Sequence, residues 1–104
     1  MQAVSLDLEP SPMLVAGSPE QGSAPFATVA GSEVGIWEMT PGTADDVEVD
    51  EVFVVISGRA TVTFLDGGET IELSAGSLCR LHEGQRTRWV VAETLRKVYV
   101  VAAE

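Results

Sequence analysis

The chain has 104 residues, sixteen of them acidic and six basic, and its net charge at neutral pH is −10. A chain of this length forms one domain, and a hydrophobic content of 45% suffices for a core without disulfide or metal support. The acidic balance excludes nucleic acid and anionic membranes as partners, because both require a basic surface.

Residues 1–34 are rich in Ser, Pro, Ala and Gly and contain only short apolar segments. Because prolines break longer strand pairing, we predict an N-terminal arm with edge strands here, followed by a β-barrel over residues 35–104. The N-terminus lacks the basic and then apolar pattern of a signal peptide, and no apolar run is long enough to span a membrane. The sequence therefore indicates a cytoplasmic protein.

The first strand of the predicted barrel covers residues 35–40 and carries Trp37 and Met39 on one face. Pro41-Gly42 ends this strand, and residues 45–51 then contain five carboxylates. Solvation of these charges at the surface is one interpretation of the acidic run. Weak, oxygen-only binding of calcium or magnesium is the alternative.

Glu51 is a carboxylate on a face that its apolar neighbours mark as inward. A strand period of two places Glu51 with Val47, Val49 and Phe53, and it places Glu48 on the opposite face. We therefore expect Glu51 to point into the barrel.

Residues 52–56 are apolar on both faces of the predicted strand. An antiparallel strand normally has one face in water, so we expect the barrel interior to cover one face and another sheet or subunit to cover the other. This pattern predicts a homodimer. A turn at Ser57-Gly58 then leads into a strand over residues 59–65.

The second half of the chain continues in short strands over residues 70–73, 78–81, 86–92 and 95–102. A hairpin is predicted at Asp66-Gly67-Gly68. About eight short strands at regular spacing are typical of an all-β sandwich or barrel. Cys79 is the only cysteine, so an intrachain disulfide cannot form, and we expect its thiol to fill space in the core.

Two motif regions in this chain resemble those of the cupin superfamily. Glu51 lies seven residues before Gly58, where that family has a glutamate, and Gly76 and Gly84 match the second motif. The strings GIWEMTPG, EVFVVISGRATVTFLDGG and RTRWVVAETLRKVYVV are similar to small single-domain cupins of the ureidoglycine aminohydrolase and ethanolamine-utilisation group, over roughly residues 35–101. The resemblance implies a single-domain jelly-roll β-barrel.

The resemblance also locates the positions at which metal-dependent cupins carry their three histidines and one glutamate. These positions are Ala44, Asp46, Glu51 and Thr87 here, so Glu51 is the only family ligand that is kept. Transition metals need several converging imidazole or carboxylate ligands. We therefore expect neither a transition metal nor another cofactor.

A carboxylate inside a barrel must be hydrogen-bonded, paired or protonated. We hypothesise that Arg80, in the second-motif half, faces the same cavity as Glu51; the alternative is that Arg80 points to solvent. If the two residues pair, Glu51 is the candidate catalytic acid or base, and Arg80 orients a carboxylate or another anion.

Three functions remain as alternatives. The first is a metal-independent barrel that binds a small organic molecule, with a carboxylate as one candidate and with Glu51 as the catalytic group of a possible enzyme. The second is a metal-dependent cupin enzyme with an atypical ligand set, and the third is a non-catalytic sensor or accessory domain that dimerises. We favour the first, and we predict that the ligand contacts Trp37, Met39, Asp46, Phe53, Arg80, Thr87 and Trp89, although core packing is the alternative for the aromatic residues.

Overall fold

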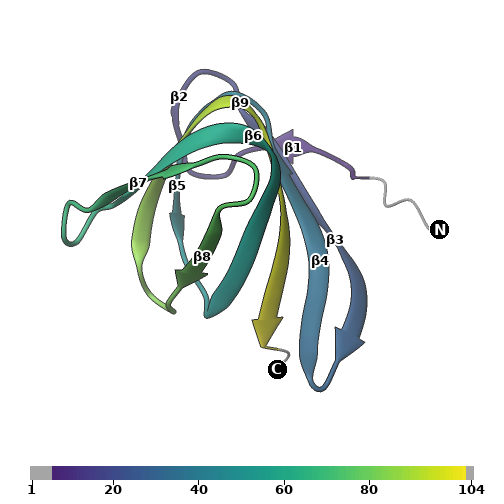
Figure 1. Cartoon of the computed structure of the whole chain (residues 1–104). Helices are drawn as coiled ribbons and strands as arrows, with labels where there is room; N and C mark the ends of the chain where they lie inside the picture. The colour runs from purple at the N-terminus through teal and green to yellow at the C-terminus, as the bar shows by residue number, and fades with distance from the viewer. Residues whose placement is uncertain (1–5, 103–104) are drawn as a thin grey trace.

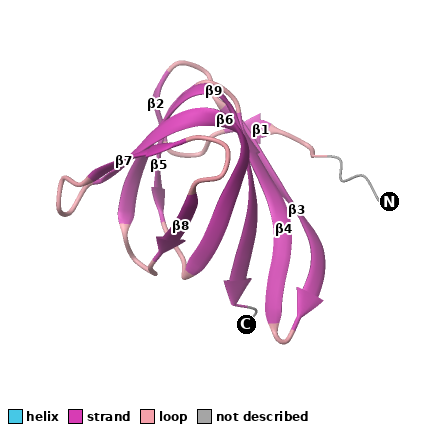
Figure 2. Ribbon diagram, viewed as in Figure 1, coloured by secondary structure: helices cyan, strands magenta, loops and turns pink. Residues whose placement is uncertain are grey.

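The computed structural model describes residues 6–102. Residues 1–5 of the predicted arm and residues 103–104 of the predicted barrel lie outside this description. The described residues form a single antiparallel sheet that curls into a nearly closed barrel (Figure 2), which confirms the all-β prediction. Its strands are β1 (Glu9–Pro10), β2 (Leu14–Ala16), β3 (Glu20–Val29), β4 (Ser32–Met39), β5 (Gly42–Val47), β6 (Glu51–Phe64), β7 (Thr70–Leu73), β8 (Leu78–Leu81) and β9 (Arg86–Ala102).

The two longest strands, β6 and β9, form the frame of the barrel. They pair along their whole length, from Glu51 opposite Val101 to Phe64 opposite Thr87, and together they arch over the top of Figure 1. Both β4 and β5 pair with β9, whereas β7 and β8 pair with β6. The β3–β4 hairpin forms one side of the barrel, and β5, β7 and β8 lie toward the other. No helix long and apolar enough to cross a membrane occurs in residues 6–102.

The predicted turn at Ser57-Gly58 is wrong, because β6 continues through it as a bulged strand. Gly58 adopts a φ of +94°, and a Cβ at this position would lie 2.1 Å from the carbonyl oxygen of Thr94. Glycine is required here for a bend and a close backbone contact rather than for a chain reversal. The same bend carries β9 through the predicted break at residues 93–94, so the four short strands expected over these segments are two long ones.

The predicted assignment of inward and outward faces in the acidic segment is also wrong. Strand β5 ends at Val47 and β6 begins at Glu51, so residues 48–50 form a corner that resets the alternation. As a result Val47 and Val49 are exposed, whereas Glu48 and Glu51 are both buried. The inward orientation of Glu51 is confirmed, but Glu48 joins it inside the barrel.

Apolar side chains on the inner face of the sheet make the core. Met39 of β4 and Phe53 of β6 are each 1% exposed, which confirms the inward face that the sequence indicated for Phe53 and Glu51. The remaining buried apolar residues come mainly from β6 and β9, and they pack with Trp37 and Cys79 at the edge of the cluster. Trp89 and Tyr99 of this cluster also border the polar side chains that follow.

Candidate functional site

A cavity of about 330 Å³ lies where the β5–β6 corner approaches the β3–β4 hairpin and the end of β9. Trp37 and Trp89 form apolar walls, and their ring centroids are 5.4 Å apart. The charged and ionisable side chains of the lining are Glu33, Asp46, Glu48, Glu51, Lys97 and Tyr99. Four carboxylates and one ammonium group therefore share the cavity.

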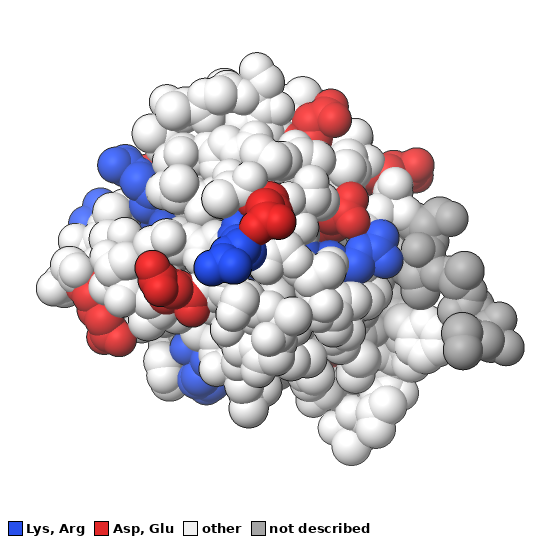
Figure 3. Space-filling view, turned by 45° about the horizontal axis from the view of Figure 1, so that its top comes forward, with Lys and Arg blue, Asp and Glu red and all other residues white. Residues whose placement is uncertain are grey.

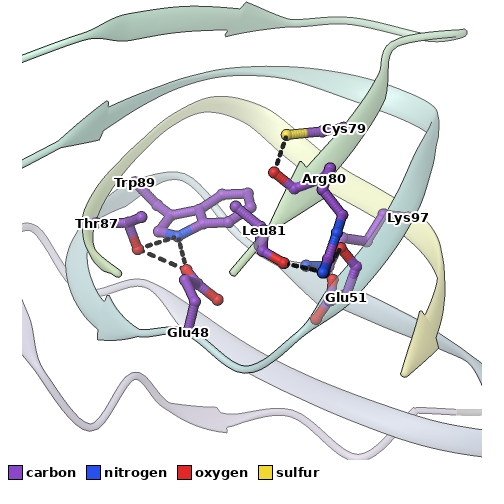
Figure 4. Close-up of polar contacts among 8 residues, drawn as sticks. All are labelled: Glu48, Glu51, Cys79, Arg80, Leu81, Thr87, Trp89 and Lys97. Carbon is purple, nitrogen blue, oxygen red and sulfur yellow. Dashed lines mark hydrogen bonds and ion pairs between the residues drawn. The ribbon is translucent and has the colours of Figure 1, made fainter. Parts of the chain in front are cut away.

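Glu51 and Lys97 form a buried ion pair at the inner wall of this cavity. Lys97 Nζ donates a 2.6 Å hydrogen bond to Glu51 Oε2, and the two residues are only 4% and 9% exposed (Figure 4). Glu51 is the first residue of β6 and its side chain points inward. Lys97 also points inward from β9, as do Leu95 and Tyr99 two residues to either side of it, so the two charged side chains meet inside the barrel.

Three aromatic rings surround the same ammonium group. Lys97 Nζ lies 4.3 Å from the ring centroid of Phe53, 4.7 Å from that of Trp37 and 4.8 Å from that of Trp89. The negative faces of aromatic rings attract a cation, and they do so more strongly when water is excluded. We call Glu51 and these three rings the ammonium cage; it fixes a positive charge inside the barrel.

Glu48 lies beside the cage and is held by two donors. Its Oε2 accepts a 2.6 Å hydrogen bond from Thr87 Oγ1 and a 3.1 Å hydrogen bond from Trp89 Nε1 (Figure 4). Burial raises the pKa of Glu48, and this effect outweighs the lowering by the Thr87 hydrogen bond; the nearby Asp46 charge raises the pKa further. Glu48 therefore keeps a proton to a higher pH than a solvated glutamate does.

Two further groups of the cavity lining, Asp46 and Tyr99, have a raised pKa. Asp46 is exposed as a residue, yet its carboxylate lies in the cavity lining, where loss of water raises its pKa. Tyr99 donates a 3.0 Å hydrogen bond to Glu33 Oε2, and burial, followed by this bond, raises the pKa of Tyr99 to about 12. The phenol thus remains a neutral donor across the ordinary pH range.

The structure brings most of the predicted ligand-contacting residues together. Trp37, Asp46, Glu51 and Trp89 line the cavity, and Phe53 contacts the Lys97 ammonium from the core side. Two other predicted residues have different positions. Met39 is packed in the core, and Thr87 is fully buried with its hydroxyl bound to Glu48.

The predicted pairing of Arg80 with the Glu51 carboxylate is wrong. Arg80 lies on the outer face of β8, because its neighbour Leu81 takes the inward position. Its guanidinium donates to the backbone oxygens of Leu81 and Glu51 (Figure 4). It also donates to Asp50 Oδ1 at 3.3 Å. It lines a separate hollow of about 390 Å³ beside residues 64–69, so it is not available to orient an anion in the cavity.

Lys97 and Glu48 are the important site residues that the sequence analysis did not identify. The sequence does contain a pattern that indicates Lys97. It lies two residues from Leu95 and two from Tyr99, so a strand period of two places this charged residue on an apolar face, as it does for Glu51. Glu48 had no such signal, since its inward direction depends on the corner between β5 and β6.

The side chains at the family's metal positions do not suit a transition ion. Ala44 is packed in the core, Thr87 is bound to Glu48, and the Glu51 carboxylate is paired with the Lys97 ammonium. Across residues 6–102 no three His, Cys, Asp or Glu side chains converge in a way that could hold a metal ion. A cationic group already occupies the place beside Glu51, which disfavours a second cation there.

Comparison with known proteins places this barrel among small cupins. A family model described as the EutQ-like cupin domain matches residues 27–99. The structure of the Clostridium difficile EutQ protein superposes with a TM-score of 0.70 at 22% identity, covering 82% of this chain and 69% of that one. A putative ethanolamine utilization protein from Salmonella typhimurium LT2 gives a TM-score of 0.68 at 20% identity, covering 80% and 69% of the two chains.

A third structure, a DUF861 family protein from Thermotoga maritima, is 32% identical over 62% of this chain and 73% of its own, with a TM-score of 0.58. A search of curated proteins found no match. The cupin barrel and the subgroup that the sequence resembled are both confirmed by these likenesses.

Proposed function

The chain belongs to the EutQ-like cupin domain family, and we propose that its barrel binds a small organic molecule in the cavity beside the Glu51–Lys97 pair, without using a transition metal. The observation that carries this proposal is the ammonium cage at the wall of an open cavity. Removing two ions from water costs several kcal/mol per ion, and apolar residues of similar volume often give equal or greater stability. The pair is therefore better explained by what it presents to the cavity than by folding.

The size and walls of the cavity define the kind of molecule that it accepts. About 330 Å³ lies at the lower end of the range of about 300–1,000 Å³ that is typical of ligand pockets. Trp37 and Trp89 offer flat apolar surface, and the carboxylates of Asp46 and Glu48 accept hydrogen bonds. A molecule of fewer than about a dozen heavy atoms with one apolar part and one donor group would suit this combination.

The charge of the cavity favours an amine or another cation over the carboxylate that the sequence analysis considered. Four carboxylates face a single ammonium, and that ammonium is already paired with Glu51. A carboxylate ligand would meet like charges with no free basic partner in the lining, whereas an amine would be attracted to Asp46 and Glu48.

Isothermal titration with matched pairs of compounds tests this function. Benzylamine is compared with benzoate, and a short alkylamine with the carboxylate of the same skeleton. We expect the amines to bind and their affinity to fall about tenfold or more in Glu48→Gln, because a bound ammonium favours the ionised form of Glu48, which glutamine cannot supply. Asp66→Asn, which changes an acidic residue outside the cavity, serves as the control and keeps wild-type affinity. Absence of binding by every compound would overturn the proposal.

A second candidate function, acid–base catalysis on the bound molecule, is favoured by the contrast between two glutamates. Glu51 is committed to Lys97, whereas the pKa of Glu48 is raised by burial. Two carboxyl groups in different environments are a common arrangement for one acid and one base. Turnover of a bound amine, lost in both Glu51→Gln and Glu48→Gln while binding persists in one of them, would establish it.

We also propose a cytoplasmic location for the protein. The described structure contains one cysteine, Cys79, with a free thiol. Reducing compartments preserve free thiols. Fractionation of cells that express the chain checks this location, and recovery in a secreted fraction would contradict it.

A further inference from the structure

Lys97 is the only lysine of the chain, and the other five basic residues are arginines. The arginine side chains are 34% to 71% exposed and are paired with acidic ones: Arg59 with Glu93, Arg80 with Asp50, Arg86 with Asp66, Arg88 with Asp45, and Arg96 with Glu38. The basic groups visible in Figure 3 lie dispersed over the surface, several of them beside acidic groups. The Lys97 side chain, in contrast, is only 6% exposed and lines the cavity.

An ion pair with Glu51 does not by itself require a lysine at position 97. Arginine carries the same charge, and its planar guanidinium binds a carboxylate through two parallel hydrogen bonds. What a lysine adds is reactivity, because its nitrogen becomes a nucleophile once a proton is removed, whereas a guanidinium stays protonated. The cavity therefore contains an amine that is able to form a covalent bond with a carbonyl carbon.

Glu51 supplies the base that such a reaction needs. Its Oε2 lies 2.6 Å from Lys97 Nζ, so a proton can pass along a hydrogen bond that already exists. Glu51 and Lys97 both line the cavity. A molecule in the cavity therefore meets the nitrogen and its base together.

We propose that Lys97 forms an imine with a small aldehyde or ketone in this cavity, an activity that goes beyond amine binding and does not depend on it. Lys97 Nζ first gives a proton to Glu51. The nitrogen lone pair then forms a bond to the carbonyl carbon, and the π electrons of the C=O bond move to the oxygen, which takes a second proton from the nitrogen. The resulting hydroxyl receives the proton held by Glu51 and leaves as water, and the nitrogen lone pair completes the C=N bond.

The ammonium cage suits the product as well as it suits the ammonium. The net reaction converts an ammonium and a carbonyl group into a protonated imine and water, so the positive charge stays on the same nitrogen. Glu51 remains the counter-ion of that charge, and three aromatic ring centroids lie 4.3 to 4.8 Å from Nζ. Two of these rings, Trp37 and Trp89, also line the cavity and offer apolar surface to the carbon skeleton of the carbonyl compound.

The acidic lining of the cavity selects among carbonyl compounds. Asp46 and Glu48 line the same space as Lys97, and a carboxylate on the ligand would meet like charges there. An uncharged aldehyde meets no such repulsion. We therefore expect benzaldehyde to react in preference to 4-carboxybenzaldehyde, which has the same skeleton with one added carboxylate.

Reductive trapping with benzaldehyde and cyanoborohydride at neutral pH tests the proposal, because reduction of the imine makes the new C–N bond permanent. The side chain of Lys97 and the α-amino group are the only primary amines of the chain, so peptide mass spectrometry assigns the label to one of two sites. The same reaction on the chain unfolded in guanidinium chloride gives the rate for Lys97 as an ordinary lysine. Glu51→Gln removes the proposed base, and Glu93→Gln removes an exposed carboxylate outside the cavity as the control.

We expect benzaldehyde to label Lys97 about tenfold or more faster in the folded chain than in the unfolded one, with a rate that saturates with benzaldehyde concentration. Glu51→Gln should lower this rate about a hundredfold, which is typical of the loss of a general acid–base group, and Glu93→Gln should keep it. Labelling of Lys97 that is no faster in the folded chain would overturn the proposal and assign Lys97 a structural role alone.

An unchanged rate in folded Glu51→Gln, or faster labelling by 4-carboxybenzaldehyde than by benzaldehyde, would also contradict the proposal. If Glu51→Gln fails to fold by circular dichroism, the comparison of the folded and unfolded wild type decides the matter alone. Because the label is found on Lys97 itself, the result is independent of whether benzylamine binds.

Discussion

Lys97 on β9 lies within 2.6 Å of Glu51 at the start of the neighbouring strand β6, and the only described carboxylate hydrogen-bonded to this ammonium is that of Glu51. The two strands that frame the barrel are thus joined by a charged contact as well as by their backbone ladder. Stability and cavity chemistry both depend on this one contact, so changes at either residue are informative.

Lys97→Met should destabilise the fold by about 3–5 kcal/mol, because it keeps the length of the side chain but leaves the Glu51 carboxylate buried without a partner. The double variant Lys97→Met/Glu51→Gln should recover most of this loss, since no uncompensated charge remains. Urea denaturation at neutral pH measures both. A single variant as stable as the wild type would show that Glu51 does not need Lys97.

Glu48→Gln should change how stability depends on pH. The pKa of Glu48 is raised in the folded state above the ordinary value for a glutamate, mainly by burial, so the native protein binds this proton more tightly than the unfolded chain does. The free energy of unfolding therefore falls as pH rises from about the unfolded pKa through the folded pKa. Glutamine keeps an acceptor for Thr87 and Trp89 but cannot ionise.

Thermal unfolding of the wild type and of Glu48→Gln across pH 3–8 measures the difference in stability between the two proteins at each pH. We expect the variant to gain stability relative to the wild type with rising pH, with the change centred above pH 4.5. A difference that is constant across this range would mean that Glu48 titrates as it does in the unfolded chain. The lowered pKa values of Asp45 and Asp66 affect both proteins equally and cancel in the comparison.

Gly58→Ala should be far more damaging than Gly76→Ala, although both glycines have a φ of +94°. At Gly76 the added Cβ has no atom within 4 Å, so only the backbone strain of about 1–3 kcal/mol is expected. At Gly58 the Cβ would lie 2.1 Å from the Thr94 oxygen, and we expect a loss above about 4 kcal/mol. Equal losses in chemical denaturation would contradict the assignment of Gly58 to a bend that brings β6 against β9.

Arg80→Ala should leave ligand affinity unchanged, because the Arg80 guanidinium is outside the cavity and bound to Asp50. Titration of an amine that binds the wild type measures this directly, with Glu48→Gln as the variant that loses affinity. A loss of ligand affinity in Arg80→Ala as large as that in Glu48→Gln would show that Arg80 contributes to the binding site.

The strand period of two explains both the successes and one omission of the sequence analysis. It placed Trp37 with Met39 on one face of a strand and Glu51 with Phe53 on an inward face, and all four side chains lie inside the barrel. The same rule applied to the predicted strand over residues 95–102 marks Lys97 as inward, between Leu95 and Tyr99, but it was not applied there. Continuity of β9 through residues 93–94 could not be predicted, because it depends on the bulge at Gly58 in a strand distant in sequence.

The partner of Glu51 could not be derived from composition. Arg80 and Lys97 are both basic residues on strands that pair with β6 near its beginning. The partner is the one whose side chain points inward as that of Glu51 does. This is fixed by the registers of β6, β8 and β9. The direction of Glu48 likewise depends on a three-residue corner that has no periodic signal.

The most direct test of the account uses the two tryptophans of the chain, Trp37 and Trp89, which both line the cavity. Their indole N–H signals are followed by ¹H–¹⁵N NMR during titration with benzylamine and, separately, with benzoate. We predict that benzylamine shifts both signals in a saturable way, with that of Trp89 shifting because its N–H is bonded to Glu48, and that benzoate shifts neither. Two unmoved indole signals with benzylamine, or saturable shifts with benzoate alone, would contradict the account.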